Sequence, residues 1–413
     1  MPDHPQLTHF AGFDWARDHH DVVIVDGAGR ILDEFRLEHS AAGWRLWQEK
    51  IAAYPHLGVA IETSFGAAAD LLLESGVSVF PVNPLNAKRY RERKISSGNK
   101  SDRHDAWALA DALRLDGHGW RRFTAQDPIL AELRILCRDE VALIEERTAL
   151  VNQLQQALAE YYPSALEAFE DWTQPGAWAF VERFPTPAAL SKAGQRKWEK
   201  FLHSHRLYRP QTAAARLAAF ANASEWKTSA PLVAAKSLHA VARVKQLRVL
   251  EAQLQEYRRR IEALFASHPD SGTFGSLPGA GAKLAPRILS EIGSERAQYP
   301  DAQGLQCVAG TAPVNYQSGK IHKTTMRRAC NKNLRHAMHL FADKSRAQCV
   351  WAATYYRALR ERGQTHAQAL RALGQRWLKI IWKMWQTRTA YDGELHLRNQ
   401  LAHGSWLLQI KPS

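Results

Sequence analysis

Hydrophobic and polar positions alternate in three short runs near the beginning of the chain. The runs are FAGFDWA, DVVIVD and RILDEFRL, which lie between Phe10 and Leu37 with Gly27 and Gly29 in the last turn. A period of two residues, bounded by turn residues, is typical of strands in a half-buried sheet. The pattern therefore predicts a β-meander.

The periodicity changes after the meander. A helix is expected over 41–53, then a buried strand LGVAIET, a helix over 67–74 and a last strand VSVFPV that ends before Pro84. Three antiparallel strands followed by alternating helices and strands outline a ribonuclease-H-like α/β domain. We assign residues 1–125 to it.

A basic segment follows the last strand. Residues 83–103 contain seven Lys or Arg against two acids, together with Gly, Asn and Ser, so a mobile basic loop is expected. The next stretch, SDRHDAWALADALR, has a serine cap and strong helix formers. Asp102 and Asp105 should therefore lie in the first turns of a helix.

Long helices are predicted in the middle of the chain. Two sets of residues recur every seven positions: Leu136, Leu143 and Leu150 within 128–160, then Leu247, Leu254 and Ile261. This spacing predicts a helical pair or coiled coil within residues 126–270. Residues 163–230, with their Pro, Trp and Ala, should form an accessory helical insertion.

The last part of the chain should be a mainly helical domain over residues 271–390, with a tail over 391–413. LPGAGAKLAPRILSEIG, from Leu277 to Gly293, has a Gly-rich turn that opens an amphipathic helix. This pattern is typical of helix-hairpin-helix elements whose backbone amides hold a phosphate, although a plain helix cap is the alternative. A Trp-rich helix through GQRWLKIIWKMW is expected to be packing surface.

The composition favours a polyanionic partner. The 413 residues carry 55 Lys and Arg against 41 Asp and Glu, a net charge of +14, and a chain of this length should form two or three compact units. No apolar run reaches the ~20 residues that span a bilayer, and MPDHPQLTHF lacks the apolar core of a signal peptide, so no membrane contact and a cytoplasmic location are expected. The four cysteines show no CxxC spacing, so no zinc site is predicted.

Four carboxylates stand where the predicted elements could bring them together. Asp14 and Glu62 each end an apolar strand, and Asp102 and Asp105 share one face of a helix. A cluster of hard oxygen ligands selects Mg²⁺ or Mn²⁺, and two such ions could stabilise the attacking and leaving oxygens of a phosphodiester exchange. One acid at a strand end is ordinarily just a solvated terminus, so the prediction depends on the four-part pattern.

Five motifs follow one another in an order that resembles a known family. GFDWA, VAIET and KSDRHDA, then a long helical spacer, then LPGAGAKLAPRILSEIG and VAGTAPVNYQSGK, are similar to the DEDD transposases of the bacterial insertion-sequence one-ten family. The resemblance covers nearly the whole chain, with 163–230 the weakest part. It implies that Asp14, Glu62, Asp102 and Asp105 form the metal-binding tetrad of a Holliday-junction-resolvase-like domain.

The same resemblance implies a serine nucleophile. Family members have a Ser-Gly pair after a GxxP segment, which corresponds here to Gly310, Pro313 and then Ser318-Gly319. It further implies a structured guide RNA, DNA of the element ends and target as substrates, and a homo-oligomer, dimer or tetramer, whose active sites combine domains of different subunits. From the residues alone, a turn serine remains the alternative for Ser318, although metal-bound carboxylates could help to ionise its hydroxyl.

Two basic segments are the candidate phosphate contacts. The second, Gly319–Arg335, is expected to be a basic helix and carries six Lys or Arg and no acid. The candidates are Lys88, Arg89, Arg91, Arg93, Lys94 and Lys100 in the first segment, and Lys320, Lys323, Arg327, Arg328, Lys332 and Arg335 in the second. A solvated basic face is the alternative.

These patterns and the resemblance together predict an RNA-guided DNA transposase or recombinase that joins strands through a phosphoserine intermediate. Two alternatives stay open. One is a metal-dependent Holliday-junction resolvase or nuclease in which water attacks and Ser318 is structural. The other is a non-catalytic nucleic-acid-binding scaffold.

Overall fold

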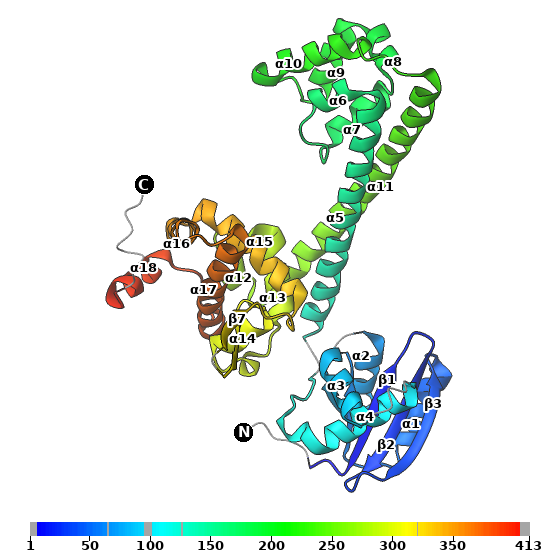
Figure 1. The fold of residues 1–413 in the computed structure, drawn as a ribbon, viewed down its shortest axis with the longest axis vertical. Coiled ribbons are helices and arrows are strands. Elements are labelled where there is room, and N and C mark those ends of the chain that lie inside the picture. Colours follow the sequence, from blue (N-terminus) through cyan, green and yellow to red (C-terminus); the bar gives the residue numbers. More distant parts are fainter. Residues whose placement is uncertain (1–5, 64–65, 95–100, 125–126, 320, 405–413) are drawn as a thin grey trace. The chain divides into compact units, whose positions relative to one another are not determined.

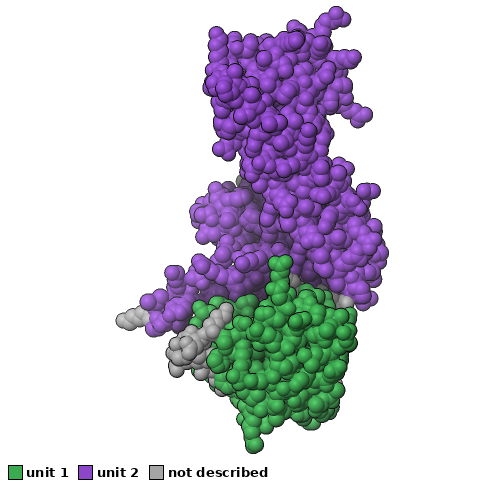
Figure 2. All heavy atoms as spheres, turned by 90° about the vertical axis from the view of Figure 1, so that its right-hand side faces the viewer, with its two compact units in different colours: residues 1–126 green, residues 127–413 purple. Residues whose placement is uncertain are grey.

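The chain divides into two compact units. In a computed structural model, which describes residues 6–63, 66–94, 101–124, 127–319 and 321–404, the units are Met1–Gln126 and Asp127–Ser413 (Figure 2). Across these ranges, none of the helices combines the length and apolar composition that a bilayer crossing needs.

The first unit is built on a mixed five-stranded sheet (Figure 1). Its strands are β1 (His9–Trp15), β2 (His19–Asp26), β3 (Ile31–Glu38), β4 (Leu57–Ile61) and β5 (Ser78–Pro81). The order is β3-β2-β1-β4-β5, with β1 to β3 antiparallel and β4 and β5 parallel to β1. The predicted meander and the mixed α/β class of this region are confirmed.

Helices cover both faces of this sheet. They are α1 (Ala41–Ile51), α2 (Ala67–Glu74), α3 (Pro84–Lys94) and α4 (Asp102–Asp116), with a 3₁₀ turn η1 (Gly117–Gly119). Phe13 and Val59 pack with Trp47 of α1 and Leu72 of α2 on one face. Ala60 and Phe80 pack with Leu109 and Leu113 of α4 on the other. Alternate residues of each strand thus enter different cores.

The basic segment after β5 was wrongly predicted as a mobile loop. Residues 84–94 form α3, and residues 95–100 lie outside the described part of the chain. Asn83 Oδ1 accepts a hydrogen bond from the Leu85 amide at 2.9 Å where the helix begins. Ala87 is buried with Phe80 and Leu109, and Tyr90 packs on the same cluster. Two apolar side chains one turn apart therefore stabilise a helix in a segment whose composition indicates a loop.

Two long antiparallel helices begin the second unit. They are α5 (Pro128–Tyr161) and α11 (Ala230–Ser267), and Glu132 pairs with Arg260 at 2.6 Å while Glu160 pairs with Lys236 at 2.7 Å. The predicted stripe of α11, Leu247, Leu254 and Ile261, is buried. The leucines predicted for α5, Leu136, Leu143 and Leu150, are only partly buried. Val151 and Leu158, which the sequence pattern places beside them at the same spacing of seven, are buried together with Leu133, Cys137 and Leu154.

A buried ionic network interrupts the apolar seam between α5 and α11. Glu140 is 2% exposed and accepts hydrogen bonds from Arg287 at 2.7 Å and from Arg258 at 3.3 Å. Glu251 accepts from Arg147 at 2.9 Å and from Arg258 at 3.1 Å. Glu140 and Arg147 stand in line with the buried Leu133, Cys137 and Val151 of α5, at positions that apolar residues would fill in a regular heptad seam.

The remaining helices of the second unit form two groups. Residues 163–230 contain α6 (Pro163–Ala168), α7 (Pro175–Arg183), α8 (Pro187–Ala193), α9 (Gln195–Ser204), α10 (Pro210–Ala221) and η2 (Asn222–Ser224). Their aromatic core is continuous with buried residues of α5 and α11. After α11 come α12 (Ser271–Gly275), α13 (Gly281–Ile292), η3 (Arg296–Gln298), α14 (Ala302–Val308), α15 (Lys332–Gln348), α16 (Val350–Glu361), α17 (His366–Thr387) and α18 (Gly393–Ala402). Trp377 and Trp385 of α17 are fully buried, which confirms that this Trp-rich helix is packing surface.

The segment that carries Ser318 is a β-ribbon. β6 (Val314–Ser318) pairs antiparallel with β7 (Ile321–Thr325), so the helix expected over Gly319–Arg335 is wrong for most of its length. Gly319 has a φ of 56°, a left-handed value that favours a tight turn rather than a helix. The helix α15 begins at Lys332, because Asn331 caps it by accepting hydrogen bonds from the amides of Asn333 and Leu334.

Candidate functional site

Strand alternation places three acids on the face of the sheet that α4 covers. In β1, Phe10 packs into the core beneath α4 and Phe13 into the core of the other face, so Asp14 lies on the α4 side. Ala60 packs under α4, and Glu62 follows two residues later. Asp21 lies opposite Asp14 in the β1–β2 register. Residues directly opposite each other share one face of a sheet, so Asp14 and Asp21 are neighbours.

A glycine allows α4 to approach this face. A Cβ atom at Gly12 would lie 1.8 Å from the carbonyl oxygen of Ala106 and 2.7 Å from the amide nitrogen of Ala110. A glycine in a strand commonly marks such a close backbone approach. Ser101 caps α4 by accepting a hydrogen bond from the amide of His104, which puts Asp102 and Asp105 in its first turn. The start of α4 thus lies beside the end of β1.

The four predicted acids meet at one pocket. Asp14, Glu62, Asp102 and Asp105 all line a cavity of about 280 Å³, together with Trp15, Ala16, His19, Asp21 and Arg91. Asp102 is exposed, Asp14 and Glu62 are half-buried, and Asp105 is buried. At ~30 Å³ for each water molecule, the pocket has room for several waters or for hydrated cations.

Burial and charge repulsion in this pocket alter the pKa of Asp14. Burial, and after it the charges of Asp105, Glu62, Asp102 and Asp21 in that order, raise the pKa of Asp14 from 3.8 to about 7. Like charges that share a site disfavour ionisation of one of their members. Asp105 has an oxygen, Oδ1, that is buried with no hydrogen-bond partner among the described residues. Buried polar atoms are rarely left unpaired, so this oxygen points to an additional ligand.

Arginines occupy two edges of the pocket. Arg91 Nη1 of α3 donates to Asp105 Oδ2 at 2.8 Å. Arg36 of β3 donates from Nε to Asp21 Oδ1 at 3.1 Å and from Nη2 to Asp21 Oδ2 at 2.9 Å. Arg36 Nη2 also lies 3.7 Å from Asp102 Oδ2. These guanidinium groups orient Asp105, Asp21 and Asp102 at the rim.

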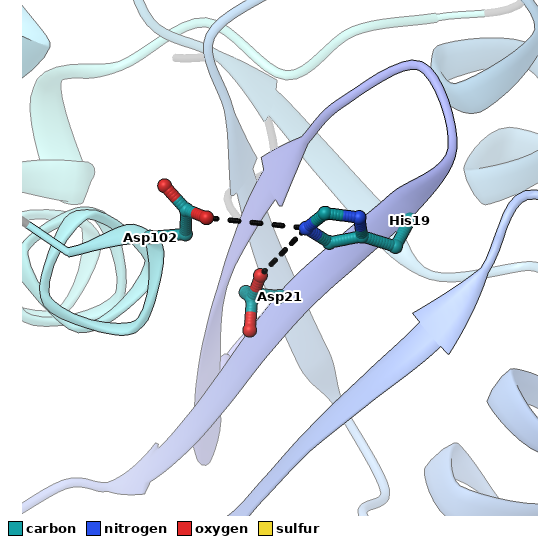
Figure 3. Close-up of side chains that lie close together, drawn as sticks. All are labelled: His19, Asp21 and Asp102. Atoms are coloured by element: carbon teal, nitrogen blue, oxygen red, sulfur yellow. Dashed lines mark ion pairs between the residues drawn. The ribbon is translucent and has the colours of Figure 1, made fainter.

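His19 and Asp21 are site residues that the sequence analysis missed. His19 Nε2 lies 3.8 Å from Asp21 Oδ2 and 3.9 Å from Asp102 Oδ2, so one imidazole bridges β2 and α4 (Figure 3). The β1–β2 hairpin contained the signal for Asp21. The position of the short turn between β1 and β2 fixes the register of the two strands, and in this register Asp14 pairs with Asp21.

Among the described residues, the possible metal ligands that lie within 4.8 Å of one another are His19, Asp21 and Asp102, whereas Asp14, Glu62 and Asp105 line the same pocket without joining that group. Asp14, Glu62, Asp102 and Asp105 supply carboxylate oxygens on one pocket, which is the donor set that Mg²⁺ and Mn²⁺ prefer. The unpaired Asp105 Oδ1 and the repulsion that raises the pKa of Asp14 would both be relieved by a cation.

Ser318 lies in the second unit, at the end of the exposed strand β6. Its register partner is Ile321, and Gly319 follows it in the turn. The structure thus places Ser318 at a hairpin turn, in agreement with the alternative prediction of a turn serine. This position also leaves its hydroxyl open to solvent.

The predicted phosphate contacts differ in their surroundings. Lys323, Arg328 and Lys332 are exposed, as are Lys88, Arg89 and Arg93. Lys88 lies 3.6 Å from Glu92 and Arg93 lies 3.8 Å from Asp116. Lys94 ends α3, and Lys100 and Lys320 lie outside the described residues.

Three more of the predicted arginines have partners within the protein. Arg91 pairs with Asp105 as above, and Arg335 Nη2 donates to the carbonyl oxygen of Arg327. Arg327 Nε in turn donates to the carbonyl oxygen of Ala312 at 3.4 Å. The last two contacts fix the chain on either side of the ribbon, so Arg327 and Arg335 have a structural role that the sequence analysis did not foresee.

Packing explains one glycine of the Gly-rich turn before α13. Gly279 has a φ of 85°, and a Cβ atom there would lie 2.9 Å from the carbonyl carbon of Lys344 in α15. Glycine is needed at this point for both backbone conformation and close approach. A phosphate contact of this turn stays a prediction.

Comparison with known proteins adds an independent observation. A family profile of transposases, named for the DEDD transposases of IS110, matches residues 11–163, and a second profile, described as the transposase IS116/IS110/IS902 family, matches residues 272–357. The chain is 34% identical over 397 residues to the candidate transposase of the IS117 mini-circle from Streptomyces coelicolor, covering 94% of this chain and 96% of that protein.

Two further relatives are of the same kind. One is an uncharacterized 43.6 kDa protein of the insertion element IS110 from Streptomyces coelicolor, 28% identical over 97% of this chain and 100% of its own length. The other is an uncharacterized 42 kDa protein of the insertion element IS900 from Mycobacterium paratuberculosis, 29% identical over 92% of this chain and 96% of its own length. The residues matched by the first profile include Asp14, Glu62, Asp102 and Asp105, and those matched by the second include Ser318.

Proposed function

The chain belongs to the IS116/IS110/IS902 family of transposases and is a DNA transposase of a mobile element, and on that basis we propose that it exchanges DNA strands by means of the acidic pocket and Ser318. One observation carries the proposal. Asp14, Glu62, Asp102 and Asp105, which are 91 residues apart at their extremes (105 − 14), line a single pocket.

The four carboxylates of the pocket would hold Mg²⁺ or Mn²⁺. When bound, the ions supply positive charge for the attacking and leaving oxygens of a phosphodiester. Arg91 and Arg36 keep the carboxylates of Asp105, Asp21 and Asp102 in place through the contacts described above. The strand order β3-β2-β1-β4-β5, with acids at the ends of β1 and β4, supports a ribonuclease-H-like, Holliday-junction-resolvase-like fold.

Ser318 is the proposed nucleophile. Its Oγ forms a bond to the phosphorus of a DNA phosphodiester, one bridging P–O bond breaks, and the leaving strand departs with that oxygen as a free hydroxyl after taking up a proton. The serine proton is lost to solvent or to a carboxylate. One ester replaces another, so a second strand end can displace the serine in the reverse reaction without an external energy source.

The partners are part of the same proposal. The exposed Lys88, Arg89, Lys323, Arg328 and Lys332 can hold phosphate groups of DNA and of a structured guide RNA. The chain is proposed to act as a dimer or tetramer, with α5 and α11 as a coiled coil that separates the two ends of the protein. The antiparallel pairing of these helices supports the coiled coil.

A denaturing gel of labelled DNA, incubated in Mg²⁺ with the full chain and the RNA encoded beside its gene, tests the proposal. The unaltered protein should give cleaved DNA and a denaturation-resistant protein–DNA adduct. Ser318→Ala and Asp14→Asn should each abolish both products without loss of DNA binding. Thr325→Ala is the matched control, because it removes one hydroxyl from the same ribbon and should leave both products unchanged.

The possible outcomes separate the functions. Full cleavage by Ser318→Ala without an adduct would identify water as the nucleophile and favour a metal-dependent resolvase or nuclease. If no protein, including the unaltered one, cleaves DNA although nucleic-acid binding is intact, the result would favour a non-catalytic nucleic-acid-binding scaffold. Either result contradicts the phosphoserine mechanism.

A further inference from the structure

The helical insertion over residues 163–230 carries a basic segment (α8 to α10 in Figure 1). From Lys192 to Arg209 the sequence contains six Lys or Arg and one acid, Glu199. This segment lies between residues 11–163 and 272–357, which the two transposase profiles match, and belongs to neither match. Its charge is therefore separate from the acidic pocket and from Ser318.

Part of this charge lies on one face of α9. Arg196, Lys200 and His203 are spaced at i, i+4 and i+7, so they share one face of the helix, and all three are exposed. The buried side chains of α9 lie on the opposite face and are Trp198, Phe201 and Leu202. Within the described residues, neither Arg196 nor Lys200 forms an ion pair. Two cations one turn apart repel each other, so this face is suited to an anionic partner.

An aromatic pair extends this face beyond the end of α9. The imidazole ring of His203 stacks on the ring of Tyr208, with the centroids 4.1 Å apart and an interplanar angle of 14°. Tyr208 is 40% exposed, so this large ring remains at the surface although it is partly covered by His203. Arg206 and Arg209, which flank Tyr208 in the chain, are exposed as well. Stacked rings and cations thus occur together.

The loop that carries Tyr208 has a fixed conformation. The carbonyl oxygen of Leu202 accepts hydrogen bonds from the amides of Leu207 at 2.7 Å and of Tyr208 at 3.2 Å. Arg216 Nη1 donates to the carbonyl oxygen of Leu207, whose side chain packs on the core of the insertion. Arg206 has a φ of 56°, a left-handed value that is unfavourable for a non-glycine residue and is often found at ligand-binding sites. Tyr208 is therefore oriented before a partner binds.

This combination of rings and cations fits unpaired nucleotides. Every base has a π face, so an exposed aromatic ring binds bases without regard to sequence, and neighbouring cations hold the phosphates. The bases of a duplex are already stacked on one another, whereas those of a single-stranded loop are free to stack on a protein ring. In the proposed function the DNA is a duplex and the structured RNA supplies the loops. Stacking that ignores sequence leaves target recognition to base pairing by that RNA.

We propose that this surface of the insertion binds an unpaired loop of the guide RNA. Tyr208, backed by His203, stacks on a base, and Arg196 and Lys200 hold phosphates beside it. The inference rests on the proposed function for RNA as the partner. It gives the insertion the role of retaining the RNA on the protein.

Fluorescence anisotropy of a labelled, unstructured RNA of about ten nucleotides, titrated with the full chain in EDTA, tests the inference. Tyr208→Ala should weaken binding about tenfold, whereas Tyr208→Phe, which keeps the ring, should bind as the unaltered protein does. Lys200→Ala should lower the slope of log affinity against log salt by about 0.7. Lys245→Ala, which removes an exposed lysine from α11, is the matched control and should not.

A photochemical crosslink locates the bound RNA. RNA that contains 5-iodouridine should crosslink on irradiation to a peptide that includes Tyr208, and circular dichroism should show that each variant is folded. Three results would overturn the inference: unchanged RNA affinity in Tyr208→Ala, crosslinks only outside residues 196–209, or tighter binding of single-stranded or duplex DNA of the same sequence through Tyr208.

The test is independent of the adduct experiment. RNA binding that depends on Tyr208, in a protein whose unaltered form makes no adduct, would keep the inference and reject the phosphoserine mechanism. Adduct formation together with unchanged RNA affinity in Tyr208→Ala would do the reverse.

Discussion

Replacement of Asp14 by Asn should stabilise the first unit in the absence of divalent metal. The pKa of Asp14 is raised from 3.8 to about 7 by burial and by four neighbouring carboxylates. A group with a raised pKa in the folded state binds its proton more tightly there than in the unfolded chain. Above pH 7 the folded protein therefore bears the cost of an unfavourable carboxylate, and Asn removes that cost.

The size of the effect follows from the shift. A rise from 3.8 to about 7 corresponds to at most ~4 kcal/mol, at ~1.4 kcal/mol for each pKa unit. Asp14 is only half-buried, so solvent screening should reduce the gain to about 1–2 kcal/mol at pH 8. Unaltered protein gains stability as the pH falls from about 7 towards 4, because the folded state takes up the proton first. The difference between variant and unaltered protein should therefore vanish near pH 4.

Hydrogen exchange measured by mass spectrometry on β1 and β4 peptides of the full chain, in EDTA at pH 8, reports the free energy of opening of this unit. Asp14→Asn should slow exchange, and Asp18→Asn, which removes an exposed carboxylate from the neighbouring turn, should not. Mg²⁺ should slow exchange in the unaltered protein much more than in Asp14→Asn. Equal exchange in all three proteins without metal would refute the repulsion argument.

Three further outcomes are expected. Glu140→Gln should lower the free energy of unfolding by about 3–5 kcal/mol, because the buried Arg287 and the half-buried Arg258 lose their carboxylate partner. Glu132→Gln, which breaks an exposed pair, should cost at most ~1 kcal/mol in the same denaturant titration. Gly12→Ala should lower the melting temperature and abolish strand cleavage, because a Cβ atom at this position would displace α4. Gly27→Ala is the control and should do neither, because nothing lies within 4 Å of a Cβ atom there. Unchanged cleavage by Gly12→Ala would contradict the close approach of α4 to β1. Arg328→Ala should lower the slope of log affinity against log salt by about 0.9, measured by DNA titration over a range of salt, and an unchanged slope would show that it holds no phosphate.

Local periodicity predicted the strands and helices of the first unit closely. The α2 helix begins at Ala67 and ends at Glu74, as the pattern indicates, and each predicted strand is present. Helix and strand periods depend on residues close together in sequence, so they can be read from the chain. Asp102 and Asp105 could be placed for the same reason, because a serine cap fixes where α4 begins.

Prediction failed where a segment's conformation depends on distant partners. The basic residues 84–94 form a helix because Ala87 and Tyr90 find a core supplied by β5 and α4. The expected helix over Gly319–Arg335 is largely a ribbon, since pairing of β6 with β7 satisfies the backbone where composition alone indicated a basic helix. The seam of α5 is polar at Glu140 because Arg258 of α11 and Arg287 of α13 converge there.

The sequence by itself determined the strand and helix order of the first unit and the identity of four acids at the ends of its elements, because these follow from short-range period and capping. Only the tertiary structure decided that the acids share a pocket. That outcome needs the register that sets Asp14 opposite Asp21 and the close approach of α4 over Gly12. The raised pKa of Asp14 and the positions of His19 and Arg91 at the pocket follow from the same long-range packing, since charges interact through space and not along the chain.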